Sequence, residues 1–185
     1  LVTTVAGAIF AQQPVKLPRA SQHTALTQTI GLTDMTIVYS RPSAKGRKIF
    51  GELGPFGQVW RTGANEATTI SFADPVTING QKLGAGSYSL HTIPDPNGWI
   101  LIFNTVDKQW GSFTYDKTKD DLRVEAKPTT TRFTELLTID VPALSTDNAT
   151  VALRWETPEV DFVAATASPA RPLANPRPST PGPEA

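Results

Sequence analysis

The feature that most constrains this chain is a series of short runs in which apolar and polar residues alternate. Met35, Ile37 and Tyr39 are separated by polar or smaller residues, and Ile70 and Phe72 repeat the pattern further along. Because successive side chains of a β-strand point to opposite faces, this alternation is typical of a half-buried strand. No segment has the spacing of a long amphipathic helix. The sequence therefore predicts an all-β protein.

Turn residues separate the runs. Asn79-Gly80 is the strongest short signal for a β-hairpin, since both residue types accept the positive φ angles of a tight turn. A second turn is predicted at 94–98, and the apolar run WILIFN at 99–104 predicts a central strand buried on both sides. Turns at this frequency are typical of a sandwich or barrel. We expect further strands at 25–30, 58–61, 108–115, 122–126, 133–141, 150–156 and 160–163.

These elements predict one domain. We expect a single antiparallel β-sandwich, jelly-roll-like, with one long excursion rich in glycine and proline between Tyr39 and Thr69. A chain of 185 residues with 39% hydrophobic content can bury one such core. The β domain is assigned to residues 12–164. Residues 165–185 are rich in proline and predict a flexible tail, with a ligand for a proline-recognising partner as the alternative.

The first eleven residues are small and apolar and precede Gln12 and Gln13. This pattern predicts the end of an export signal, with an N-terminal strand or short buried helix as the alternative. We therefore expect an exported protein, periplasmic or extracellular. No other apolar run approaches the roughly eighteen residues that span a bilayer, so no membrane-spanning segment is expected.

The amino-acid composition limits the kinds of partner and reaction that this protein can support. The formal net charge is zero and the pI is near 6.9, so no overall field would attract nucleic acid. The absence of cysteine excludes disulfides, thiolate metal sites and cysteine nucleophiles. His23 and His91 are the only histidines and cannot build an all-histidine metal site. We expect neither a metal nor a cofactor.

Charged, aromatic and amide side chains gather in the excursion. A guanidinium offers a planar fork, and an ammonium a point charge, for a carboxylate, phosphate or sulfate. Glycines beside these cations would let a ligand approach backbone amides. The candidate ligand-binding residues are Tyr39, Arg41, Lys45, Arg47, Trp60, Arg61, Asn65 and Glu66.

These residues also have structural interpretations. The cations could form a solvated loop in which Arg61 pairs with Glu66 or Glu52. Trp60 could stack on a sugar ring or an aromatic ligand, or it could pack in the core, as we expect of Trp99 and Trp155. The same question is open for Trp110, which precedes a glycine.

Glu66 and His91 are the candidate catalytic residues. Neighbouring cations would hold Glu66 ionised while burial would oppose its charge, which suits an acid or base. His91 could act as a general base, although an isolated histidine in a strand is more often structural. The chain has no nucleophile elbow, phosphate-binding loop or dinucleotide fingerprint. Whether the protein catalyses a reaction therefore stays open at this point.

Seven segments carry a resemblance to a known family. They are PRASQ (18–22), YSRPSAKGRKIFGEL (39–53), VWRTGANEATTISF (59–72), GAGSYSLHTIP (84–94), WILIFN (99–104), WG (110–111) and LRWE (153–156). On these segments the chain resembles the DUF2911 family, exported bacterial proteins of unknown function that are common in Bacteroidetes. The resemblance covers about 18–163 and implies an extracytoplasmic β domain, without a catalytic assignment.

Three functional hypotheses follow. The first is a binding module for an anionic or polar ligand, such as a sugar derivative or an envelope component. The second is an envelope hydrolase or lyase that uses Glu66 or His91 as base, with Arg41 or Arg61 stabilising developing negative charge. The third is a structural subunit of an extracellular assembly, in which an exposed edge strand or the apolar N-terminal segment pairs with a neighbouring copy.

Overall fold

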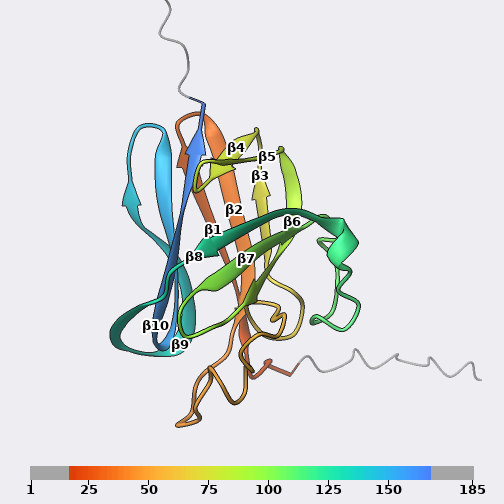
Figure 1. The fold of residues 1–185 in the computed structure, drawn as a ribbon, viewed down its shortest axis with the longest axis vertical. Coiled ribbons are helices and arrows are strands. Elements are labelled where there is room, and N and C mark those ends of the chain that lie inside the picture. Colours follow the sequence, from red (N-terminus) through yellow and green to blue (C-terminus); the bar gives the residue numbers. More distant parts are fainter. Residues whose placement is uncertain (1–16, 168–185) are drawn as a thin grey trace, which may run out of the picture.

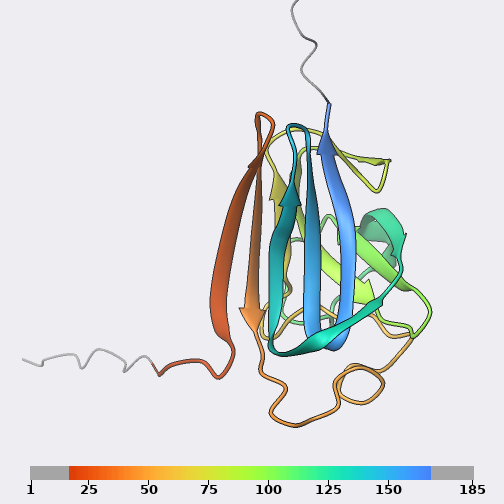
Figure 2. The ribbon, with the colours of Figure 1, turned by 90° about the vertical axis from the view of Figure 1, so that its left-hand side faces the viewer.

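The computed structural model describes residues 17–167, which form two antiparallel sheets (Figures 1 and 2). The six-stranded sheet has the order β1-β2-β3-β6-β7-β8, and the four-stranded sheet has the order β5-β4-β10-β9. Apart from one short 3-10 turn, η1 (Lys117–Lys119), the described part of the chain has no helix. The strands are β1 (Gln22–Ile30), β2 (Thr33–Arg41), β3 (Thr69–Phe72), β4 (Val76–Ile78), β5 (Gln81–Leu83), β6 (Gly86–Ile93), β7 (Trp99–Asn104), β8 (Asp120–Ala126), β9 (Thr129–Leu144) and β10 (Asn148–Thr166). The predicted β-sandwich is confirmed.

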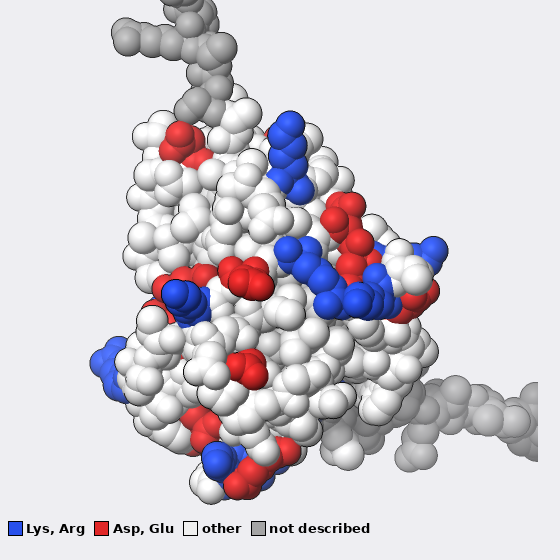
Figure 3. All heavy atoms as spheres, viewed as in Figure 1, with Lys and Arg blue, Asp and Glu red and all other residues white. Residues whose placement is uncertain are grey.

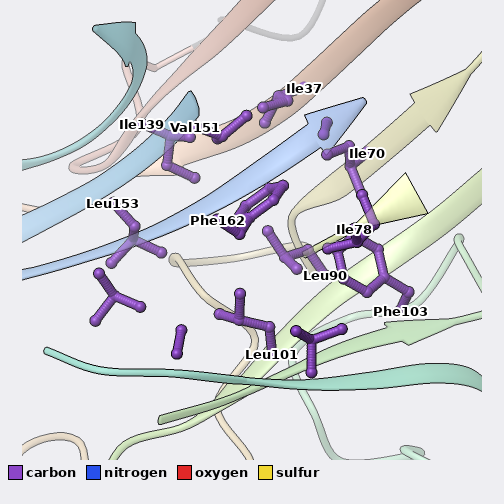
Figure 4. Close-up of a cluster of buried hydrophobic side chains, with 14 of the residues drawn as sticks. Ile37, Ile70, Ile78, Leu90, Leu101, Phe103, Ile139, Val151, Leu153 and Phe162 are labelled. Atoms are coloured by element: carbon purple, nitrogen blue, oxygen red, sulfur yellow. The ribbon is translucent and has the colours of Figure 1, made fainter. Parts of the chain in front are cut away.

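The core lies between the two sheets and follows the alternation of the sequence. Ile37 in β2 is fully buried, whereas its neighbours Thr36 and Val38 are only partly buried. Figure 4 shows Ile37 and Leu101 of the six-stranded sheet in one cluster with Ile139 and Phe162 of the four-stranded sheet. Removal of these apolar side chains from water is the main stabilising contribution to a sandwich of this kind.

The strongest turn and strand signals of the sequence are confirmed. Asn79 and Gly80 have φ angles of 47° and 81° and join β4 to β5 as a tight hairpin. The WILIFN run coincides with β7, which pairs with β6 on one edge and β8 on the other. A strand between two neighbours needs apolar side chains where both of its faces are covered, which explains the unbroken run.

Two predicted strands, 58–61 and 108–115, are wrong, and two others are parts of a single strand. The segments 150–156 and 160–163 belong to one strand, β10. Its pairing with β9 shifts register on both sides of Glu156, and these irregularities allow Pro158 to lie within the strand. The segment 108–115 is a loop, because Gly111 has a φ of 68° and only Trp110 forms a bridge, with Glu66. Segment 58–61 likewise forms one isolated bridge, between Trp60 and Thr92.

The excursion connects β2 to β3 and covers one end of the sandwich (Figures 1 and 2). Two acidic side chains from the four-stranded sheet hold it there. Glu156 accepts hydrogen bonds from the backbone of Ile49 at 2.9 Å and Phe50 at 3.2 Å. Glu135 accepts one from the backbone of Lys45 at 2.8 Å. An irregular segment thereby acquires fixed anchor points.

Aromatic rings pack together and cover the core at the same end of the sandwich. Trp60 of the excursion stacks on Trp155 with ring centroids 5.8 Å apart, and Phe50 lies edge-on to Trp99 at 4.8 Å. Trp99 and Trp155 are 2% and 3% exposed, which confirms that both are core residues. Trp60 is partly buried and packs against this core.

The ends of the expected domain lie near the limits of the described residues. β10 continues to Thr166, two residues beyond the expected boundary at 164. The expected export-signal remnant at 1–11, and all of the expected tail beyond Ala167, lie outside the described residues.

Candidate functional site

A cavity of about 720 Å³ opens on the outer face of the six-stranded sheet. We call it the outer groove. Val38 and Ser40 of β2 and Thr69 of β3 contribute to its floor. They alternate with the inward-facing residues Ile37 and Ile70, so their side chains point away from the core. Its size falls within the range of small-molecule sites in proteins.

One wall of the outer groove is an ion pair between residues far apart in the sequence. Arg19 Nη1 donates to both carboxylate oxygens of Glu66 at 2.7 Å. This hydrogen bond lowers the pKa of Glu66 below its usual value. Both side chains are about half exposed, at 53% and 48%, so solvent screens their attraction. His23 of β1 also lines the groove.

Next to this ion pair, the groove is lined by the connection between β7 and η1, which we call the 105–116 loop; Trp110 of this loop forms a backbone bridge with Glu66. Its backbone is joined to the excursion, because Ala67 N–H donates to Gln109 and Gly111 N–H donates to Asn65, each at 3.0 Å. Trp110 lies between these two bonds and is 58% exposed at the groove. The loop therefore presents a flat apolar ring beside a polar floor.

The charges that line the outer groove balance. Arg19 and Lys108 are cationic, whereas Glu66 and Asp107 are anionic. Basic and acidic side chains are also interspersed on the face shown in Figure 3, where a mixed group of both signs lies over η1 and the start of β8. The groove thus has many polar groups without a strong field of either sign.

A second group of polar side chains lies beneath the 105–116 loop. Tyr115 donates its hydroxyl hydrogen to Asp120 Oδ2 at 2.6 Å and accepts from Arg123 Nη2 at 2.6 Å. Arg123 Nε also donates to Asp120 at 2.7 Å, and Asn104 donates to the other carboxylate oxygen at 2.8 Å. Burial, together with the bond to Asp120, raises the pKa of Tyr115 to about 12. This network ties the end of the loop to β8.

His91 is fully buried beside that network, with its ring centroid 5.2 Å from that of Tyr115. Burial lowers the pKa of His91 below its usual value, so the ring is neutral at neutral pH. The backbone of Gly111 and Ser89 and the charge of Asp120 act in the opposite direction. Even so, neither ring nitrogen makes a hydrogen bond of acceptable geometry within residues 17–167.

Two of the predicted ligand-binding residues face the edge of β9. Tyr39 accepts from the backbone N–H of Ile139 at 2.9 Å and donates to its carbonyl at 3.2 Å. Arg41 donates from Nε to the carbonyl of Leu137 at 2.9 Å and from Nη2 to Thr138 at 2.8 Å. Both side chains thus hydrogen-bond to an edge strand of the other sheet.

The other predicted residues are also separated from one another. Arg47 donates to the carbonyls of Ala44 and Ser43 at 2.9 and 2.7 Å, within its own turn. Lys45 is exposed, and Trp60 packs on the core. The remaining three residues take different places: Arg61 beneath the 105–116 loop, Asn65 bonded to Ser21 at 3.3 Å, and Glu66 in the outer groove.

The two candidate catalytic residues are not brought to one cavity among those found in the described chain. Glu66 faces the outer groove and pairs with Arg19, whereas His91 is buried beneath the loop.

Sequence reasoning missed Arg19, His23, Lys108 and Gln109 as groove residues. They come from segments on either side of the excursion, and only tertiary contacts bring these segments together. The sequence did contain a signal for two of these segments, because PRASQ at 18–22 and the Trp110-Gly111 pair are both among the segments that resemble the family.

Fold and groove together define an antiparallel β-sandwich protein with a polar groove on the outer face of its larger sheet. Residues 21–163 match the family described as protein of unknown function (DUF2911), and the chain belongs to this family. No curated protein and no solved structure matched the chain. Within residues 17–167, no three potential metal-ligating side chains cluster to hold an ion. No helix of that part is long and apolar enough to cross a membrane.

Proposed function

We propose that this protein is an extracytoplasmic binding module that holds a polar ligand of the sugar class in the outer groove. The observation that carries the proposal is the exposed indole of Trp110 in a groove whose floor includes the hydroxyl-bearing residues Ser40 and Thr69. An exposed tryptophan offers a partner a large, flat apolar surface, and its indole N–H can add a polar contact.

The chemistry of a sugar ring fits both parts of the groove. One face of a pyranose carries C–H groups that can lie flat on an indole, while its hydroxyl groups need hydrogen-bond partners around the edge. Ser40 and Thr69 supply hydroxyls, and Gln109 supplies an amide. Small-molecule sites usually combine apolar or aromatic surface with polar groups that fix the orientation of the ligand, and this groove contains both.

The balance of charge favours a ligand that is neutral or carries a single charge. Arg19 already binds Glu66, and Lys108 is adjacent to Asp107. A strongly anionic ligand would have to compete with Glu66 for Arg19 and would be repelled by Asp107, which would reduce its net gain in electrostatic energy. Within the class of anionic or polar ligands, sugars and their singly charged derivatives are therefore preferred.

Export is part of the proposal and rests on the small, apolar residues 1–11. Expression of the chain with and without these residues, followed by cell fractionation, tests it. We expect the full chain outside the cytoplasm and the shortened chain inside.

Calorimetric titration tests the ligand class. Glucose, N-acetylglucosamine and glucuronate, each as monomer and short oligomer, would be titrated into the wild type and Trp110→Ala. We expect binding of at least one sugar, weakened at least about fivefold in Trp110→Ala through the loss of ring stacking.

Phe113→Ala is the matched control, because Phe113 is an exposed aromatic residue of the same loop, at 84%, that does not line the groove. It should bind like the wild type. Equal weakening in both variants, or no binding of any sugar by the folded wild type, would refute the proposal.

A further inference from the structure

Arg61 has an unusual environment for a cation. It is partly buried, and its side chain makes no hydrogen bond or ion pair with any residue of 17–167. Its Nε is completely buried without a partner. Glu66, a carboxylate expected to pair with it, pairs with Arg19 instead. A guanidinium removed from water without compensation destabilises the fold, so its retention calls for a partner.

The register of the backbone places Arg61 and His91 on one face. Trp60 and Thr92 form an antiparallel bridge with backbone hydrogen bonds of 2.8 and 2.9 Å in both directions. Trp60 packs toward the core, so the next residue, Arg61, points to the outer face. His91 precedes Thr92 and points the same way, opposite to the core residue Leu90. Both side chains thus lie on the outer face of the sheet.

Gly111 of the 105–116 loop lies over this position. A side-chain carbon on Gly111 would be 3.6 Å from Arg61 Nη1, and its backbone lies near the His91 ring. Arg61 and His91 therefore lie between the sheet and the loop, and both are close to Gly111. Neither residue lines the outer groove, so this position is distinct from the proposed sugar site.

The charges beneath the loop do not cancel. Arg61 and Arg123 contribute two positive charges and Asp120 contributes one negative charge, while His91 is neutral because burial lowers its pKa. Tyr115 is also neutral, since its pKa is about 12. One positive charge is left over, and it belongs to Arg61, because Arg123 is bonded to Asp120 at 2.7 Å.

We propose that Arg61 and His91 form a binding site for a small carboxylate beneath the 105–116 loop. A carboxylate is planar and accepts two parallel hydrogen bonds from a guanidinium, which would include the unpartnered Nε. The neutral His91 ring has one N–H to add as a further donor. The single negative charge of a carboxylate would also balance the net positive charge of Arg61, Arg123 and Asp120. Arg61 keeps partial exposure, which gives a small anion a route from solvent.

NMR titration of the full chain tests this site. With nitrogen-15 in the histidine rings and arginine side chains, acetate should produce saturable shifts of the His91 ring and of Arg61 Nε–H. In Arg61→Gln the affinity for acetate should fall about tenfold or more, because a charge-assisted hydrogen-bond pair is lost. Arg61→Lys keeps the charge without the fork and should give an intermediate affinity.

Arg47→Gln is the matched control, since it removes an arginine of the same excursion whose donors are bonded to Ala44 and Ser43. It should bind acetate like the wild type, and so should Trp110→Ala, which separates this site from the sugar site. If Arg61→Gln does not fold, the wild-type titration and Arg61→Lys still decide the matter.

Any of the following outcomes would overturn the proposal: no saturable shift in the wild type, unchanged affinity in Arg61→Gln, equal weakening in Arg47→Gln, or binding of phosphate but not acetate. Glucuronate and glucose complete the panel. Binding of glucuronate without acetate would assign Arg61 to the acid group of a groove ligand, and would also overturn an independent site.

Discussion

Single side chains of the excursion have separate roles, although they are neighbours in the sequence. Arg47 closes its own turn, Arg41 binds β9, and Arg61 lies beneath the 105–116 loop. Arg41 and Arg47 each donate hydrogen bonds to nearby carbonyl groups. Arg61 has no such partner within residues 17–167. Adjacency in sequence therefore does not translate into a shared site.

The buried ring of His91 should make stability depend on pH. Its folded-state pKa lies below the ordinary value of 6.5, so the unfolded chain binds a proton more readily than the folded protein. The contribution is fully present above the unfolded-state pKa and is lost as pH falls, so the free energy of unfolding should decrease from about pH 7 to about pH 5.5. Urea denaturation at both pH values measures this decrease in the free energy of unfolding.

His91→Gln should lose most of this pH dependence, whereas His23→Gln, at an exposed position, should keep it. The carboxylates Glu66 and Glu135 do not interfere, because their lowered pKa values lie below 4.5 and thus below this range. The same slope in His91→Gln as in the wild type would contradict the assignment.

At the scale of elements, side chains from β2 and the excursion cover the edge of β9. An unpaired strand edge invites pairing with another chain, and covering it is a common protection. Leu137 N–H donates to the carbonyl of Pro42 at 3.0 Å, and Ala44 N–H donates to the carbonyl of Glu135 at 2.8 Å. With the bonds from Tyr39 and Arg41, the middle of this edge is occupied.

Tyr39→Phe tests this link between the sheets. The variant leaves the N–H and carbonyl of Ile139 without their partner in a buried place, so we expect a loss of about 1–3 kcal/mol in the free energy of unfolding. Tyr88→Phe is the control, because that hydroxyl donates to the carbonyl of the exposed Gly84 at 3.0 Å, and the substitution should cost less than about 1 kcal/mol. Equal losses in urea denaturation would contradict a special role for Tyr39.

At the scale of the whole molecule, both sheets share one core. The buried cluster includes Trp99 of the six-stranded sheet and Trp155 of the four-stranded sheet, and Phe50 of the excursion lies within 4.8 Å and 6.2 Å of these two rings. Neither sheet buries its apolar face without the other. The two sheets and the excursion should therefore unfold together.

Trp110→Phe provides a clean measurement of this cooperativity, because it removes the exposed tryptophan and leaves the fluorescence of the three tryptophans that lie in the core or pack against it. We expect coincident urea transitions by tryptophan fluorescence and by far-ultraviolet circular dichroism. A fluorescence transition that clearly precedes the loss of strand signal would show that the aromatic end opens separately.

The β class, the hairpin at Asn79-Gly80 and the central strand 99–104 could be predicted from the sequence, because alternation and turn chemistry act between neighbours in the chain. The strand boundaries near Pro158 and in 108–115 could not, since neighbouring sheets and loops decide whether such segments pair. Local pattern carries little information about distant partners.

In the candidate site, too, some features follow from the sequence and others depend on tertiary contacts. By itself the sequence determined that cations, tryptophans and glycines are concentrated near the excursion, and that the chain folds as a β-sandwich. Only the tertiary structure decided that Arg19 meets Glu66, that Trp110 faces a groove and that Arg61 has no partner within residues 17–167. The physical reason is that sheet packing joins residues about fifty positions apart, a distance across which no local preference acts.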